Sequence, residues 1–250
     1  MKHELKDNMQ KNFYDITPFN FSLKKKDVIK MMNPLLKKVI IENKNKKIFD
    51  IGCGCGRNLM FAIDYSSKLL GLDFSQKSLA IARNILGEKV KLIHANNLNI
   101  PLENNMADVV ISDGVCHHTG NTQKAFYECV RVLKPNGLLY LAIYKKYRYY
   151  PLVYFSLGFI LRIMMKYSTG KKIIENFIIK LYYLIYKCFK NNKLSLDETR
   201  NIFFDYFLTP IATFHSSNEV KKWVDNSNSK IVDYDRTNGN CHVFLIKKNV

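Results

Sequence analysis

The chain has 250 residues, enough for one large domain or for a core domain with an appendage. Its longest uncharged stretch, residues 149–161, is shorter than the roughly 20 residues that span a bilayer, so the sequence predicts no transmembrane helix. The net charge of +18 is uneven: residues 1–47 carry +7 and residues 144–190 carry +9, whereas the remaining segments are nearly neutral. The excess of Lys and Arg favours two basic surfaces, although a general bias in composition also explains part of it.

The N-terminus and the cysteines indicate a cytoplasmic protein. MKHELKDNMQKNFYD has no apolar core of a secretory signal. Six cysteines are scattered without a C-x-x-C pair, which is typical of reduced thiols. Cys53 and Cys55 have no second pair to complete a structural zinc site, so no metal is predicted.

Helices and strands are expected in this order along the chain. Residues 1–47 predict a helical lead-in, with a helix that starts at Asn33-Pro34. Strands and helices then alternate. The expected strands are 47–52, 68–74, 90–95, 107–112 and 138–144, and the expected helices are 57–65, 75–86 and 122–133. A KPNG turn is expected at 134–137. This rhythm predicts an α/β fold, a doubly wound and mostly parallel sheet with helices on both faces.

The alternation stops at Lys145 and returns near Ser216. Residues 145–215 predict a helical insertion, with two helices rich in Tyr, Phe and Ile at 149–167 and 173–190. A capping box from Ser216 to Glu219 then opens a helix, and two strands around Asn238-Gly239 form a hairpin. We therefore expect an N-terminal lead-in (1–47), a core (48–144 and 216–250) that ends in an antiparallel strand, and an insertion (145–215).

A glycine-rich loop, IFDIGCGCGRN, joins the first strand to the first helix of this core. Such a loop at the first crossover lets the backbone approach a ligand closely. The spacing is D-x-G-x-G-x-G, whereas dinucleotide-binding proteins use G-x-G-x-x-G. The spacing therefore disfavours a nicotinamide-dependent oxidoreductase. A second acid, Asp73, ends the next strand, and its two oxygens can accept both hydroxyls of a ribose.

Four motifs in order resemble class I S-adenosylmethionine-dependent methyltransferases of the small-molecule or lipid type. They are DIGCGCG, LDFS, HANNLNIPLENNMADVVISDGVCHHT and RVLKPNGLLYL. The resemblance is strong over residues 46–144 and weak over 216–250. It implies a Rossmann-like fold, S-adenosylmethionine as the cofactor and methyl transfer as the activity.

Carried onto this sequence, the resemblance implies a set of cofactor-binding residues. The set comprises Asp50, Gly52, Cys53, Gly54 and Gly56 around the methionine half, Asp73 at the ribose, Phe74 against the adenine, Asn96, Asn97 and Leu98 at the adenine edge, and Ser112 at the methionine moiety. Asn96 stands where the family often has Asp, and its amide oxygen can still accept a hydrogen bond. A polar turn at 96–97 and a strand-end cap at Asp73 remain alternative interpretations.

Three residues are candidates for the base that a hydroxyl acceptor requires. His117 follows the fourth strand at the sheet's carboxyl end and is the first candidate, whereas its neighbour His118 is expected to point elsewhere. His215 and Tyr144 bracket the insertion and are further candidates. A structural polar role is the alternative for each, and carbon methylation of an acidic substrate needs no base.

The composition of the insertion helps to predict which kind of molecule accepts the methyl group. Residues 144–190 hold nine tyrosines and ten Lys or Arg but one acid, Glu175. This composition suits a lid over the active site or a peripheral membrane contact through residues 145–190, and the two are compatible. We expect a small-molecule or lipid-like acceptor. Nucleic acid is disfavoured because SDGV replaces the Asn/Asp-Pro-Pro-aromatic motif of amino-methylating enzymes. A nucleic-acid methyltransferase and a non-catalytic partner subunit remain the alternatives.

Overall fold

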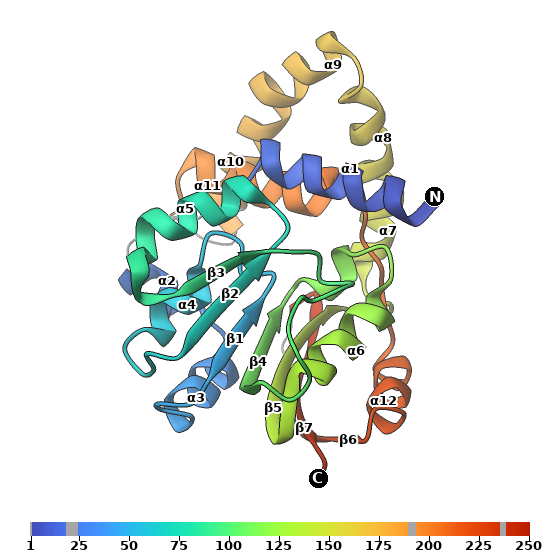
Figure 1. Ribbon diagram of the computed structural model, residues 1–250. Coiled ribbons are helices and arrows are strands. Elements are labelled where there is room, and N and C mark those ends of the chain that lie inside the picture. The colour runs from blue at the N-terminus through green and yellow to red at the C-terminus, as the bar shows by residue number, and fades with distance from the viewer. Residues whose placement is uncertain (1, 19–24, 190–193, 236–238) are drawn as a thin grey trace.

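The computed structural model describes residues 2–18, 25–189, 194–235 and 239–250 and contains one seven-stranded sheet (Figure 1). The strand order is β3-β2-β1-β4-β5-β7-β6, parallel from β3 to β5 and antiparallel from β5 to β6. The strands are β1 (Ile48–Ile51), β2 (Leu69–Asp73), β3 (Lys91–His94), β4 (Ala107–Asp113), β5 (Leu133–Tyr144), β6 (Ser229–Asp235) and β7 (Cys241–Lys248). The predicted fold class is confirmed. Asn238, predicted in the hairpin turn, lies outside the described residues.

Helices cover both faces of the sheet because its central strands are apolar on both sides. One core joins the sheet to α2 (Lys25–Met31), α3 (Pro34–Glu42), α4 (Arg57–Ala62) and α5 (Gln76–Leu86). The other joins it to α6 (Thr122–Val132) and α12 (Ser217–Asp225). Short 3-10 turns, η1 (Gly87–Lys89) and η2 (Cys116–His118), follow α5 and β4. This two-faced burial holds the carboxyl ends of β1, β2 and β4 at one edge.

The KPNG segment differs from the prediction. It lies inside β5 and does not precede it, because β5 begins at Leu133. The register with β4 moves from Ala107–Leu133 to Val109–Leu138, so residues 134–137 bulge out of the ladder. Asn136 takes φ +64°, the left-handed backbone that Asn tolerates.

The insertion holds more helices than the two predicted. The first predicted helix is broken at Ser156 into α7 (Tyr149–Phe155) and α8 (Leu157–Met164). Helix α9 (Ser168–Ile173) fills the gap between the two predicted helices, and the second predicted helix comprises a π-helical turn η3 (Ile174–Ile178) and α10 (Ile179–Phe189). A further pair, α11 (Leu196–Phe203) and the π-helical turn η4 (Phe204–Leu208), was not predicted. Among the described residues, no helix is long and apolar enough to cross a membrane.

The N-terminal helix α1 (Lys2–Ile16) lies across the carboxyl end of the sheet, beside the insertion (Figure 1). The buried side chain of Gln10 fastens it there: Nε2 donates to Thr209 Oγ1 at 2.9 Å and Oε1 accepts from Ile211 N at 2.9 Å. Both segments that interrupt the α/β rhythm therefore meet above the same edge of the sheet.

Candidate cofactor and acceptor site

The loop after β1 requires glycine at three alternate positions. Gly52, Gly54 and Gly56 have φ of +80°, +52° and +83°. A Cβ on Gly52 would lie 2.3 Å from Val115 Cγ1, and one on Gly56 would lie 2.7 Å from Leu86 Cδ1. A Cβ on Gly54 would meet nothing within 4 Å. Gly52 and Gly56 therefore serve the packing of the loop, and Gly54 leaves open space beside it.

Asp73, at the end of β2, organises this loop. Its carboxylate accepts from Gly54 N at 2.8 Å and from Ser75 N at 2.9 Å. Burial raises the pKa of Asp73, and these backbone donors oppose that rise. Each carboxylate oxygen has a second acceptor position, so the side chain can also bind a hydroxyl.

The loop after β3 contributes two asparagines that behave differently. Asn96 Oδ1 accepts from Leu98 N at 2.9 Å and stabilises the turn. The side chain of Asn97 is buried, and its Oδ1 has no hydrogen-bond partner. A buried amide oxygen without a partner is costly, which indicates a place for a donor from a ligand.

Acidic groups lie below and beside the glycine loop. Asp50 is buried and its Oδ2 has no partner. Burial, and then the charge of Asp113, raise the pKa of Asp50 to about 8, while Arg57 opposes the rise. Arg57 Nη2 and Asp113 Oδ2 form an ion pair at 2.9 Å. Ser112 does not face the cavity: it is buried against Cys116 Sγ at 3.2 Å.

The glycine loop, Asp73, Asn96, Asn97, Arg57 and Asp113 border one cavity of about 370 Å³. It is lined by Tyr14, Val28, Gly52, Cys53, Gly54, Cys55, Arg57, Asn58, Met60, Asp73, Phe74, Ser78, Asn96, Asn97, Asp113, Gly114, Val115, His118, Thr119, Tyr144, Asp205, Tyr206 and Cys241. The predicted residues brought together here are Gly52, Cys53, Gly54, Asp73, Phe74, Asn96, Asn97 and Tyr144. Those outside the lining are Asp50, Gly56, Leu98, Ser112, His117 and His215.

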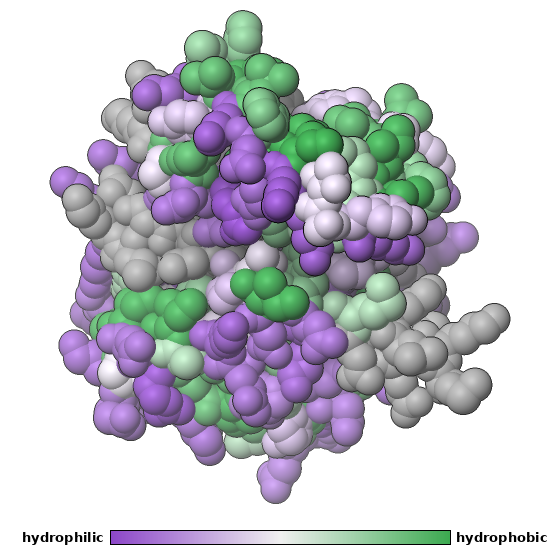
Figure 2. All heavy atoms as spheres, turned by 90° about the horizontal axis from the view of Figure 1, so that it is seen from above, coloured by the Kyte–Doolittle hydropathy of each residue, from purple (hydrophilic) through white to green (hydrophobic). Residues whose placement is uncertain are grey.

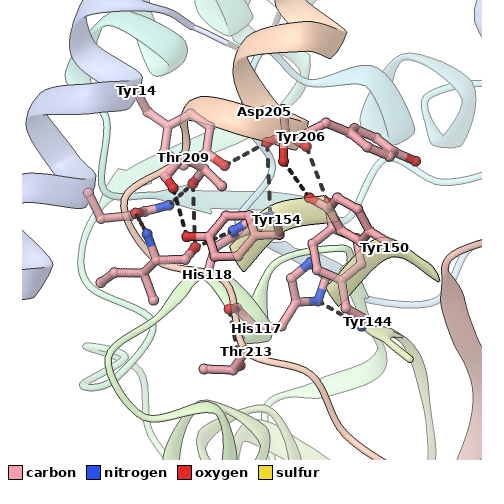
Figure 3. A network of polar contacts seen from close by, with 12 residues as sticks. Tyr14, His117, His118, Tyr144, Tyr150, Tyr154, Asp205, Tyr206, Thr209 and Thr213 are labelled. Carbon is pink, nitrogen blue, oxygen red and sulfur yellow. Dashed lines mark hydrogen bonds and ion pairs between the residues drawn. The ribbon is translucent and has the colours of Figure 1, made fainter. Parts of the chain in front are cut away.

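Part of the lining belongs to a polar and aromatic cluster (Figure 3). Asp205, from η4, accepts from Tyr14 Oη at 2.8 Å and from Tyr144 Oη at 3.4 Å. Burial first, and then the charge of Asp205, raise the pKa of Tyr14 and Tyr144, so both keep their protons. His118 Nε2 lies 3.9 Å from Asp205 Oδ1. Helix α1, the turn η2, β5 and the insertion each supply one member of this cluster.

The structure places the two adjacent histidines opposite to the prediction. His118 lines the cavity, whereas His117 is fully buried and stacks on Tyr144 with ring centres 3.7 Å apart. Tyr144 N donates to His117 Nδ1 at 3.3 Å, and Nε2 has no partner. Burial, followed by the charges of His118 and His215, holds the pKa of His117 well below its usual value. His117 therefore lies away from the position where an acceptor would meet it.

The tautomer of His118 follows from its partner. Nδ1 lies 2.7 Å from the carbonyl oxygen of Ile211, which can only accept, so Nδ1 carries the hydrogen. Nε2 is then the nitrogen left for chemistry. His215 differs: its Nε2 contacts Thr213 Oγ1 at 3.1 Å and its ring packs edge-on against Trp223, away from the cavity.

Sequence reasoning missed Tyr14, His118, Asp113 and Asp205. A signal existed for Asp113, because side chains of a strand alternate between faces and Ser112 and Asp113 cannot both point the same way. None of the motifs pointed to Tyr14 or Asp205, since both reach the cavity only through long-range packing.

The residues present fit S-adenosylmethionine on structural grounds. Gly54 leaves space beside the loop, and the lining residues Asn58 and Asn97 each have a buried Oδ1 without a partner. These acceptors suit the amino groups and hydroxyls of a nucleoside joined to an amino acid. Among the described residues, no three His, Cys, Asp or Glu side chains cluster so as to hold a metal ion.

Comparison with known proteins agrees with this geometry. Residues 49–141 match the family model described as a methyltransferase domain. The chain is 31% identical to the human probable tRNA methyltransferase 9B over 137 residues, 53% of this chain and 28% of that protein. It is 32% identical to a demethylmenaquinone methyltransferase of Geobacillus sp. (strain WCH70) over 120 residues, 45% of this chain and 48% of that protein.

The matched segment thus spans less than half of either relative. Among solved structures, the PH0226 protein of Pyrococcus horikoshii OT3 superposes with a TM-score of 0.62 at 17% identity, covering 96% of this chain and 99% of that one, which supports the fold. Together with the cavity, these matches support S-adenosylmethionine as the cofactor of the site. Residues 49–141 are therefore similar to a methyltransferase domain, and the sheet that holds them has the Rossmann-like fold that the structural comparison supports.

Proposed function

We propose that the protein is a methyltransferase that moves the methyl group of S-adenosylmethionine to a small-molecule or lipid-like acceptor. The observation that carries this proposal is the cavity itself, which is lined by the glycine loop and also by Tyr14, Tyr144 and Asp205. A lining of aromatic rings suits an acceptor with an apolar body and helps to exclude water from the reacting atoms. Residues 145–215 then act as a lid, since they supply Asp205 and Tyr206 to the lining.

The cofactor end divides its tasks among the loops after β1, β2, β3 and β4. Asp73 would hold the ribose hydroxyls, Phe74 would lie against the adenine and Asn97 would accept from the adenine amino group. Gly52, Cys53 and Gly54 would border the methionine half, with Asp50 beneath it. When bound, the cofactor supplies an activated methyl group, so the protein must mainly align the acceptor and exclude water.

His118 is the residue we place as base in the proposed reaction. Its Nδ1–H donates to Ile211 O, which leaves Nε2 as the ring nitrogen available to an acceptor in the cavity. An acceptor hydroxyl at that point would pass its proton to Nε2 as its oxygen takes the methyl group. Asp205, 3.9 Å away, would stabilise the resulting imidazolium. Tyr14 and Tyr144 donate to Asp205 and hold its side chain in this position.

The test compares two neighbouring histidines. The purified protein is incubated with S-adenosylmethionine labelled on the methyl group and with an extract of its source, and transfer of label is measured. We expect His118→Gln to lower transfer by roughly 10²- to 10⁴-fold with unchanged binding of S-adenosylhomocysteine. His117→Gln, the matched control, should keep transfer within about tenfold once its stability is allowed for. Equal losses would contradict the role of His118.

The same products identify the acceptor class. Label that partitions into organic solvent, or aqueous label that resists nuclease and protease, supports the proposal. Nuclease-sensitive label would favour the second candidate, a nucleic-acid methyltransferase. That candidate is supported by the similarity to probable tRNA methyltransferase 9B and by the net charge of +18. Binding of S-adenosylhomocysteine without any transfer would favour a non-catalytic partner subunit.

A further inference from the structure

The insertion has two apolar faces, and only one of them is covered. The inner face of α7, α8, η3 and α10 is buried in two clusters that also contain η4 and Phe214. Its fully packed members include Tyr150, Leu161 and Ile174. Arg162 joins this inner side, with Nη1 donating to Phe207 O at 2.8 Å. The fold of the lid therefore does not need the side chains on its outer face.

The outer face of α7 to α10 carries large apolar side chains in water. Among the described residues, fifteen of the twenty-two exposed large hydrophobic side chains lie between residues 145 and 189. They are Tyr147, Tyr149, Leu152, Phe155, Leu157, Phe159, Ile160, Ile163, Tyr167, Ile173, Phe177, Leu181, Leu184, Ile185 and Phe189. Single exposed apolar residues are ordinary, but such a concentration marks a binding surface.

Positive charge is interleaved with this apolar face. The exposed basic residues of the same segment are Lys146, Arg148, Lys166, Lys171, Lys172, Lys180 and Lys187. Its one acid, Glu175, is ion-paired with Arg200 Nη2. Figure 2 looks from above onto this end of the molecule and shows hydrophobic and hydrophilic areas side by side. The outer face is thus both apolar and strongly cationic.

We propose that the outer face of α7 to α10 docks on an anionic membrane surface. Helices of this kind lie in the plane of the interface, with apolar side chains among the acyl chains and Lys or Arg at the headgroups. The hairpin of α8 and α9–α10 projects beyond the rest of the molecule, where a flat surface can reach both of its arms (Figure 1). No helix among the described residues spans a bilayer, so the contact is peripheral.

Charge decides between a membrane and a second copy of this chain. A symmetric dimer through this face would bring two strongly cationic surfaces together, and like charges disfavour that contact. An anionic bilayer complements the charge and covers the apolar side chains at once. The inference extends the proposed function, because η4 of the same insertion supplies Asp205 to the acceptor end of the cavity.

The test measures co-sedimentation with vesicles and does not use the methyl-transfer reaction, so either proposal can fail alone. Vesicles of phosphatidylcholine with an equal part of phosphatidylglycerol are compared with pure phosphatidylcholine, at low and high salt. We expect binding to the anionic vesicles at low salt, and at least tenfold weaker binding to the neutral ones or at high salt. Equal binding to both compositions, or none to either, overturns the proposal.

Two double variants distinguish docking by the outer face from a general effect of the protein's net charge. Phe177→Glu with Leu181→Glu changes side chains that are 71% and 60% exposed on the outer face. Ile41→Glu with Val232→Glu adds the same charge at side chains that are 47% and 44% exposed elsewhere. The first pair should weaken vesicle binding at least tenfold more than the second. Equal losses would mean that net charge alone binds the vesicles, which contradicts docking by this face.

A conservative variant gives a second readout. Phe177→Trp should bind vesicles like the unchanged protein, and its added fluorescence should shift to the blue and be quenched by brominated lipid. Ile41→Trp is the matched control and should not respond. Cofactor-analogue binding by every variant checks folding. Loss of self-association in the Phe177→Glu, Leu181→Glu variant, without vesicle binding by the unchanged protein, would instead assign the face to a second copy of the chain.

Discussion

The two ends of the cavity are built in different ways. The cofactor end comes mainly from residues 50–114, where short loops follow parallel strands and the glycine pattern sets the backbone. The acceptor end joins α1, η2, β5 and η4, held by hydrogen bonds such as Gln10–Thr209, between residues 199 positions apart. The cofactor end is thus specified by local sequence and the acceptor end by tertiary packing. Substitutions at the two ends should therefore affect stability and ligand binding differently.

The largest expected effect is at Gly52 in the cofactor end. A methyl group there meets Val115 and a φ of +80°. Gly52→Ala should lower the free energy of unfolding by roughly 2–5 kcal/mol, the combined cost of left-handed backbone and overpacking. Gly54→Ala should lower the free energy of unfolding by only about 1–2 kcal/mol, because its methyl group has no close neighbour and only the left-handed backbone is unfavourable. It should nevertheless weaken S-adenosylhomocysteine binding at least tenfold, because the methyl group fills the ligand's space.

Thermal denaturation and calorimetric titration separate these two glycines. If Gly54→Ala bound the analogue normally, the open space beside Gly54 would not belong to the cofactor. If Gly52→Ala were as stable as the unchanged protein, the loop would have a second conformation that relieves the contact with Val115.

The next effect concerns pH and Asp50. Its pKa is raised from 3.8 to about 8 in the folded protein, so the unfolded chain releases a proton that the folded chain keeps. Between about pH 4 and pH 8 the free energy of unfolding should therefore fall as pH rises, by up to about 1.4 kcal/mol per pH unit, and level off above pH 8. Asp50→Asn should remove most of this slope, measured by urea unfolding at several pH values.

Asp108→Asn is the matched control. A hydrogen bond from Lys134 lowers the pKa of Asp108, so its contribution to stability is complete above pH 4 and is lost as pH falls below that. This control should leave the slope between pH 4 and pH 8 unchanged. An unchanged slope in Asp50→Asn would show that Asp50 is already ionised in the folded protein.

The smallest effect is expected at the joint between α1 and the insertion. Gln10→Ala leaves Ile211 N and Thr209 Oγ1 without their partner and should cost about 1–3 kcal/mol. Hydrogen exchange at Ile211 should rise, while S-adenosylhomocysteine affinity should stay within a factor of two or so because the cofactor end is independent. Gln123→Ala removes an exposed hydrogen bond on α6 and serves as control. A large loss of cofactor-analogue affinity would show that the two ends are coupled.

The same contrast explains how much the sequence could predict. The core strands and the glycine loop were found because apolar runs, caps and positive-φ glycines are local properties. Ser112 and His117 were predicted to face the ligand, whereas their neighbours Asp113 and His118 line the cavity. Each depends on which way a strand or a short 3-10 turn faces, and that is decided by packing.

In the insertion, one helix could have been predicted from the sequence, whereas two other features could not. Ser195 and Glu198 form a capping box of the kind that was recognised at Ser216, so helix α11 was open to prediction. The break at Ser156 and the place of Asp205 were not, since both follow from how α8 packs on η4. Tyr14 belongs with these, because its contacts with Asp205, Phe74 and His118 all join segments that are distant in the sequence.

The strand order has a consequence for the chain during synthesis. Strand β7 lies between β5 and β6 and pairs with both, so β5 keeps an open edge until residues 241–248 have left the ribosome. Once β7 has paired, Lys248 at its end also donates to Val130 O and Leu133 O, and these hydrogen bonds attach β7 to the end of α6 and the start of β5. An unpaired, apolar edge is prone to pair with other chains. A nascent chain halted before β7 is thus a natural client for a chaperone.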